Sequence, residues 1–180
     1  MRHCSHYSVN QNVFLDLHTL TYLDVSGCSH LTSDSPHGLP QLKKLNISSC
    51  SSMSWVALKN LRSLETLIMT ECYGFQDQPG EDYYILSTLR CLSYFKPTKC
   101  TFLKSETFFK VLATIDSLTC LDLSPRLDWH DWKEKHLLLL RKDVEINIGP
   151  PFWNVGSKLQ KHFKRNLIVN NARLFWHKFW

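Results

Sequence analysis

Apolar residues recur along this chain in a fixed order, Leu-x-x-Leu-x-apolar-x-x-Cys, with polar residues between them. The three best copies span residues 20–28, 42–50 and 64–72, so the repeat length is 22 residues both times. Within each copy two apolar residues alternate with polar ones, as at Leu23 and Val25, which predicts a short strand with one buried face. A tandem repeat of this kind predicts an array in which each unit buries its apolar residues against its neighbours.

The same phase locates three less regular units farther along the chain. An apolar residue stands three positions before the start of each unit, and the strand then follows. We therefore predict about six units over residues 14–149, preceded by an N-terminal segment or cap at 1–13 and followed by a cap or tail at 150–180. The predicted strand centres are Leu23, Leu45, Leu67, Leu92, Leu121 and Val144.

The segments that return from one strand to the next differ in composition. Residues 29–40 contain prolines and a glycine, which favours turns over a long helix. Short helices are predicted at 54–60 and 83–87, and further helices after Ser105 and at 133–141. The buried side of the helix after Ser105 is expected to carry Phe108, Phe109, Leu112 and Ile115.

The repeated motif resembles the leucine-rich repeat. Its terminal cysteine, with an apolar residue three positions later at Leu31, Met53 and Phe75, is similar to the cysteine-containing subtype of F-box/LRR proteins and related free-standing repeat proteins. The resemblance covers about residues 14–149. It implies an α/β leucine-rich-repeat solenoid with short parallel strands on the concave face and helices and turns on the convex face. It also implies a protein-interaction scaffold, with substrate recognition in a cullin-type ubiquitin ligase, next to a cullin-ligase adaptor, as the leading specific function.

The concave face is the expected binding surface of such a solenoid. Side chains between the buried strand positions point outward there. They form a small, polar surface of mixed charge, which suits a protein or peptide partner better than a polyphosphate. The predicted partner-binding residues are Tyr22, Asp24, Ser26, Lys44, Asn46, Thr66, Ile68, Ser93, Phe95, Asp122 and Glu145.

The seven cysteines fall into periodic and non-periodic ones. Cys28, Cys50 and Cys72 are expected to pack at the strand ends as small buried side chains. Cys91 and Cys120 fall in one outward row on adjacent predicted strands, and two interpretations stay open: a redox-active or metal-binding pair, or two ordinary thiols. The odd total, with the polar start of the chain, favours a reducing compartment, the cytoplasm or nucleus.

Sequence motifs for catalysis and for cofactor or metal binding are not found. The chain has no glycine-rich phosphate loop, no Gly-x-Ser-x-Gly, no His-Glu-x-x-His and no Cys-x-x-Cys. His3, Cys4 and His6 lack a fourth ligand at metal-binding spacing, and the pair His130 and Asp131 lacks a nucleophile. No enzyme activity, cofactor or metal is therefore expected.

The net charge of +5 is a mild excess of 21 Lys and Arg over 16 Asp and Glu, and much of it lies near the C-terminus. Basic residues alternate there with aromatic ones such as Trp153 and Trp176, a composition that can bind nucleic acid or an anionic membrane surface. Leu159, Phe163 and Leu167 recur at helical spacing, which favours a cap over the open end of the array. Binding through this basic aromatic segment is the alternative function.

Overall fold

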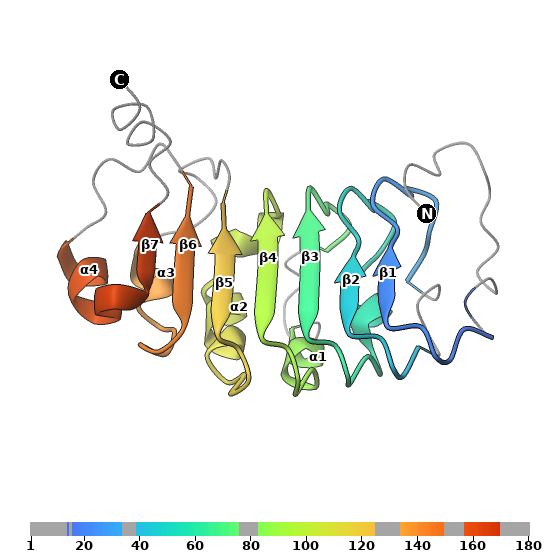
Figure 1. Cartoon of the computed structure of the whole chain (residues 1–180). Helices are drawn as coiled ribbons and strands as arrows, with labels where there is room; N and C mark the ends of the chain where they lie inside the picture. The colour runs from blue at the N-terminus through green and yellow to red at the C-terminus, as the bar shows by residue number, and fades with distance from the viewer. Residues whose placement is uncertain are drawn as a thin grey trace, which may run out of the picture.

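The described part of the chain forms one sheet of seven parallel strands (Figure 1). The order of the strands in the sheet is their order in the chain, so each repeat pairs with the next. The computed structural model describes residues 14, 16–33, 39–75, 83–124, 134–149 and 157–169. The strands are β1 (Tyr22–Asp24), β2 (Lys44–Asn46), β3 (Thr66–Thr70), β4 (Tyr94–Thr98), β5 (Cys120–Leu123), β6 (Glu145–Ile148) and β7 (Leu167–Val169).

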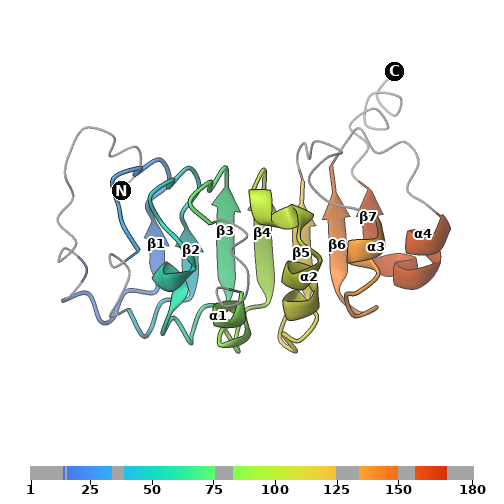
Figure 2. The same cartoon turned by 180° about the vertical axis from the view of Figure 1, so that it is seen from behind.

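The described helices leave one face of the sheet uncovered (Figures 1 and 2). Helices α1, α2 and α3 lie behind the sheet in Figure 1 and in front of it in Figure 2, and α4 lies at the end beside β7. We call the opposite side the open face; it is the side predicted to be concave. The helices are η2 (Trp55–Leu58), α1 (Tyr84–Ser87), η3 (Thr101–Lys104), α2 (Glu106–Leu112), α3 (Glu134–Leu137), α4 (Ser157–Phe163) and η4 (Lys164–Asn166), where η denotes a 3-10 helix.

The inward side chains of the strands form a continuous apolar ladder. Each strand supplies only one or two such residues, so a single repeat cannot bury them and the array is stabilised by stacking. The residues aligned along the centre of the ladder are Leu23, Leu45, Leu67, Phe95, Leu121, Ile146 and Leu167.

The fourth and sixth strands are displaced from the predicted register. Phe95, rather than Leu92, pairs with Leu67 and lies at the centre of β4. Ile146 takes the central place in β6 that the sequence prediction assigned to Val144. The prediction for β4 was wrong because the preceding segment has an apolar residue at every third position, so more than one phase fits the pattern.

The periodic cysteines form hydrogen bonds where the strands end. Sγ of Cys50 donates to the carbonyl oxygen of Val25 at 3.1 Å, and Sγ of Cys72 donates to that of Ile47 at 3.1 Å. Cys100 makes the equivalent contact one repeat later, at 3.6 Å. Each thiol thus donates a hydrogen bond to a buried carbonyl group of the preceding repeat, which would otherwise lack this partner. These cysteines are structural, in agreement with the sequence prediction.

The residue before each of these cysteines has a left-handed backbone. The angle φ is 77° at Gly27, 60° at Ser49, 58° at Glu71 and 56° at Lys99. Glycine adopts this conformation readily, whereas a residue with a side chain pays about 1 to 2 kcal/mol in steric strain. The shape of the turn is therefore imposed by the stacking of the repeats and not by local sequence preference.

Aromatic side chains fill the space between the sheet and the helices. The Trp55 ring lies at their centre, with ring centroids 5.1 Å from Phe75, 5.4 Å from Tyr83 and 4.9 Å from Phe102. Phe108 of α2 extends the cluster, 4.7 Å from Phe102. Each such contact adds about 0.5 to 1.5 kcal/mol beyond area burial. The cluster therefore joins the helical sides of neighbouring repeats.

The predicted helices are present with altered bounds. Helices α1 and α2 lie where they were predicted, and Ser105 stands at the N-cap position of α2. The segment predicted as a helix at 54–60 contains the 3-10 helix η2, and the one predicted at 133–141 contains the shorter α3. The predicted turn-rich return of the first repeat lies partly outside the described residues, at 34–38.

The sheet continues beyond the six predicted strands. Helix α4 buries Leu159 and Phe163, but Leu167 is not part of this helix and begins β7, which pairs with β6. No helix among the described residues is long and apolar enough to cross a membrane. The role predicted for the terminal segments stays a prediction, because the structure does not describe residues 1–13, 150–156 and 170–180.

Candidate protein-binding surface

The open face displays two rows of side chains that run across the strands. The backbone register assigns one residue of each strand from β1 to β6 to each row. The first row is Tyr22, Lys44, Thr66, Tyr94, Cys120 and Glu145. The second row, two residues farther along each strand, is Asp24, Asn46, Ile68, Lys96, Asp122 and Asn147.

Three members of the second row bind the turn that follows their own strand. Oδ1 of Asp24 accepts hydrogen bonds from the backbone N–H of Ser26 at 3.1 Å and from its hydroxyl at 2.7 Å. Asn46 and Asp122 accept the same pair of bonds from the serine two residues on. Such turns satisfy an N–H group locally and compete with strand extension. The two carboxylates are therefore nearly buried in a structural role.

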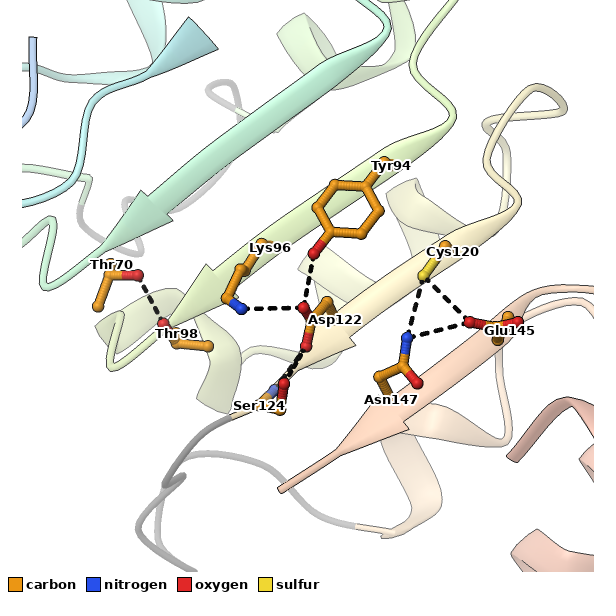
Figure 3. Close-up of polar contacts among 9 residues, drawn as sticks. All are labelled: Thr70, Tyr94, Lys96, Thr98, Cys120, Asp122, Ser124, Glu145 and Asn147. Atoms are coloured by element: carbon orange, nitrogen blue, oxygen red, sulfur yellow. Dashed lines mark hydrogen bonds and ion pairs between the residues drawn. The ribbon is translucent and has the colours of Figure 1, made fainter. Parts of the chain in front are cut away.

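Ile68 and Lys96 interrupt this series in the middle of the sheet. Neither side chain can accept a hydrogen bond from a following N–H group. Strands β3 and β4 accordingly continue to Thr70 and Thr98, where the two hydroxyl oxygens lie 2.7 Å apart (Figure 3). The two longest described strands thus lie side by side and place an isoleucine and a lysine on the open face.

Pro97 removes a backbone hydrogen bond between β4 and β5. At the equivalent positions directly after β1 and β2, the N–H groups of Val25 and Ile47 donate to the next strand at 2.9 and 3.0 Å. Proline has no N–H group, and the β4–β5 register ends at Phe95. Side chains take over the connection between these strands from that point.

One carboxylate joins β4 to β5 on the open face. Oη of Tyr94 donates to Oδ2 of Asp122 at 2.6 Å, and Nζ of Lys96 donates to the same oxygen at 2.9 Å (Figure 3). Burial raises the pKa of the Asp122 carboxyl, but hydrogen bonds from Ser124, Tyr94 and Lys96 outweigh burial and hold this pKa below its usual range. Burial and the bond to Asp122 raise the pKa of the Tyr94 hydroxyl. The carboxylate is therefore charged and the phenol neutral at neutral pH.

Cys120 contacts β6 and not a second cysteine. Nδ2 of Asn147 donates to Sγ of Cys120 at 3.3 Å and to Oε1 of Glu145 at 3.0 Å (Figure 3). Burial and the Glu145 carboxylate raise the pKa of the Cys120 thiol to about 11. Its neighbour on β4 is Tyr94, whereas Cys91 lies exposed before that strand. The predicted adjacency of two cysteines is wrong, because it depended on the displaced register of β4.

The described residues contain no group of three or more side chains placed to hold a metal ion. The candidate ligands His3, Cys4 and His6 lie outside the described residues, as does the pair His130 and Asp131.

The predicted partner-binding residues divide by their position. Tyr22 is 54% exposed. Six are at least partly exposed in the two rows: Tyr22, Lys44, Asn46, Thr66, Ile68 and Glu145. Three others form hydrogen bonds at the turns that follow the strands. Asp24 and Ser26 bind each other, and Asp122 binds the serine two residues farther on. Whether the exposed residues bind a partner stays a prediction.

Two of the predicted residues require correction. Phe95 is 0% exposed and lies in the apolar ladder, so it cannot contact a partner. Ser93 precedes β4, so its predicted place in the second row is wrong; it is partly exposed, its hydroxyl donates to the carbonyl oxygen of Glu65 at 3.2 Å, and its role in binding stays a prediction. Both changes of position follow from the displaced register of the fourth strand.

The sequence prediction missed Tyr94 and Lys96. The available signal was Cys100, because counting back from it as from Cys72 places Tyr94 in the first row and Lys96 in the second. The cysteine marks the register better than the leucines do. Its thiol contacts a carbonyl group of the preceding repeat, so the cysteine has one defined place in each unit. Leucines occur at several places in each unit and therefore fit more than one register.

Comparisons with solved structures identify the class of fold. The chain is similar to internalin C2 from Listeria monocytogenes, with 20% sequence identity and a TM-score of 0.51 over 87% of this chain and 63% of that one. It is also similar to Toll in the Drosophila Toll–Spätzle complex, with 13% identity and a TM-score of 0.62 over 91% of this chain and 22% of that one. It spans less than two thirds of each. Both are leucine-rich-repeat proteins, and with the parallel sheet they show that this chain is an α/β leucine-rich-repeat solenoid.

No family model matches the sequence, and no curated protein matches it either. The likeness to the solved structures lies in the fold, so the function is argued from the residues of the open face.

Proposed function

We propose that this chain is a protein-interaction scaffold that binds a protein or peptide segment across its open face. The observation that carries this proposal is the position of Ile68. It is partly exposed in the second row, between Asn46 and Lys96, and beside the charged network of Tyr94 and Asp122. An apolar side chain flanked by aromatic and polar groups is typical of the central part of a protein interface.

The charges of the open face favour a protein over a polyphosphate. Lys96 is paired with Asp122 at 2.9 Å, and Glu145 adds a further carboxylate to the first row. Lys44 is left as the single cation of the two rows without an ion pair among the described residues. Nucleic-acid binding depends on several cations that neutralise successive phosphates, and these two rows do not offer such a series.

The length of the surface also suits an extended segment. Neighbouring strands lie about 4.8 Å apart, so the six strands that form the rows span a little over 20 Å. A peptide crossing them can place alternate side chains against Tyr22, Ile68 and Tyr94. Toll, which has a similar fold, was solved in complex with Spätzle, so a protein ligand is compatible with a solenoid of this kind.

The test is affinity capture with the whole chain and two matched variants. Ile68→Arg introduces a charge into the open face, and Leu139→Arg introduces the same charge at an exposed apolar residue on the segment after α3. We expect partners that the wild type and Leu139→Arg both retain and that Ile68→Arg loses. Partners retained by both variants and lost at raised salt would contradict the proposal and favour the basic C-terminal segment.

For the specific role, we propose the cysteine-containing subtype and substrate recognition in a cullin-type ubiquitin ligase. The support is the series of buried thiols at Cys50, Cys72 and Cys100, each bonded to the preceding repeat. Recovery of cullin-complex subunits in the same captures is the expected result. Their absence, in captures that do yield partners lost by Ile68→Arg, would favour a free-standing scaffold.

A further inference from the structure

A second candidate surface lies on the helical side of the solenoid, away from the open face. The 3-10 helix η2 of the second repeat and helix α1 of the third pack against each other there (Figure 2). A solvent-open groove of about 500 Å³ lies along them. It is lined by Val56, Lys59, Asn60, Arg62, Tyr84, Ile85 and Thr88.

The apolar wall of this groove arises from the shortness of the two helices. Helix η2 has four residues and buries Trp55, Ala57 and Leu58, which leaves Val56 turned outward and 40% exposed. Helix α1 also has four residues and buries Leu86, which leaves Tyr84 67% exposed. Exposing apolar side chains to water is unfavourable, so a partner that covers both gains binding free energy.

The polar wall of the groove is basic. Lys59 and Arg62 form no ion pair among the described residues, although Lys43, Lys99 and Lys110 do elsewhere on the surface. Asn60, between the two cations, has a left-handed φ of 73°, and its carbonyl oxygen accepts from the N–H group of Arg62 at 2.9 Å. This tight turn lies between the lysine and the arginine, and both residues line the groove. Among the residues that the structure describes, no acidic side chain lines the groove to neutralise them.

We propose that this groove binds an acidic peptide segment of another protein, with one apolar side chain of the peptide against Val56 and Tyr84. The carboxylates of the peptide pair with Lys59 and Arg62, and an arginine can hold a carboxylate by two parallel hydrogen bonds. The charge complementarity selects an acidic partner, and the exposed apolar wall selects a segment that is not acidic throughout. This inference does not depend on the function proposed for the open face.

The test uses fluorescence anisotropy with the whole chain and fluorescein-labelled synthetic peptides of about ten residues. One peptide alternates Glu and Asp with Leu and Phe, and its control replaces every acid by the matching amide. We expect the acidic peptide to bind at least about tenfold more tightly than the amide control at low salt, with the difference shrinking as salt rises.

Two pairs of variants locate the site. Lys59→Glu with Arg62→Glu should weaken the acidic peptide about tenfold or more, whereas Lys104→Glu with Lys158→Glu, which alters the net charge equally at exposed lysines outside the groove, should not. Tyr84→Ser should weaken binding several-fold, and Tyr73→Ser, at a 54% exposed tyrosine that does not line the groove, should leave it unchanged.

Three results would overturn the proposal. They are equal binding of the acidic and amide peptides, equal losses from the two charge-reversed pairs, and tighter binding of a labelled single-stranded oligonucleotide than of the acidic peptide. Far-ultraviolet circular dichroism and thermal unfolding of each variant establish that it is folded. All the substituted side chains are exposed, so we expect each variant to stay folded.

Discussion

Oη of Tyr94 and Oδ2 of Asp122 lie 2.6 Å apart on neighbouring strands, although the two residues are 28 positions apart in the chain. The bond spans the place where Pro97 deprives β4 of a backbone donor to β5. Beyond Phe95, side chains and not the backbone therefore connect the two strands at the centre of the open face.

Replacement of Asp122 by asparagine should destabilise the protein by about 1 to 3 kcal/mol at neutral pH, because the variant loses charged hydrogen bonds from Tyr94 and Lys96. The pKa of Asp122 is lowered in the folded state, so its contribution is present above about pH 4, the ordinary aspartate range, and is lost as the pH falls below it. Urea unfolding as a function of pH measures this. Parallel pH profiles of wild type and variant would contradict it.

Replacement of Tyr94 by phenylalanine tests the other end of the same bond. The pKa of Tyr94 is raised in the folded state, so its contribution is present below about pH 10, the ordinary tyrosine value, and is lost as the pH rises above it. We expect the variant to be less stable than the wild type at neutral pH and to lose this alkaline component. Unfolding measured from neutral to alkaline pH distinguishes the two. Tyr22→Phe, at an exposed tyrosine of the same row, is the control.

Thiol labelling should separate the cysteines by position. Burial raises the pKa of Cys50 to about 12, and the neighbouring Cys100 thiol with burial raises the pKa of Cys72 well above its ordinary range. We expect iodoacetamide at neutral pH to modify the exposed Cys91 rapidly and to leave Cys50 and Cys72 unmodified until denaturant is added. Peptide mapping by mass spectrometry reads this out. Equal rates at Cys72 and Cys91 in the native protein would contradict the buried ladder.

The left-handed turn positions predict opposite effects of two substitutions. Gly27→Ala should destabilise the protein by about 1 kcal/mol, because alanine at φ of 77° is strained. Ser49→Gly should stabilise it by about 0.5 to 1 kcal/mol, since relief of strain at φ of 60° exceeds the entropy that glycine adds to the unfolded chain. Thermal unfolding measures both. Ser51→Gly, at a nearby exposed serine outside the left-handed set, should give no gain.

The register of β4 can be tested by truncation. Phe95→Ala should cost about 3 to 5 kcal/mol, because the ring is fully buried in the ladder. Ile68→Ala, at a partly exposed residue of the open face, should cost about 1 kcal/mol or less. Denaturant unfolding measures the two free energies. A small loss at Phe95 would support the register predicted from the sequence instead of the one observed.

Much of the fold was predictable because the repeat is regular in its first half. The period of 22 residues located β1, β2 and β3, and β5 was placed correctly from the same phase. The structural role of the cysteines followed from their period. The pairing of Leu23, Leu45 and Leu67 was correct because identical spacing leaves one register for three successive strands.

The candidate site was less predictable, because its centre lies where the repeat is irregular. The side chains around Asp122 come from β4 and β5, which are separated by a return segment that contains η3 and α2. No local sequence pattern predicts the register of these two strands. The same holds for the groove between η2 and α1, whose walls come from different repeats. Both depend on contacts between residues that are distant in the chain.

The sequence by itself determined the kind of unit, its approximate number and the face that is buried, because these depend on short periods of apolar residues that stacking must hide from water. Only the tertiary structure decided that Phe95 is inside and that Tyr94 and Lys96 face Asp122. The physical reason is that parallel strands take their register from backbone hydrogen bonds to the neighbouring repeat, and an apolar spacing of three residues satisfies more than one such register.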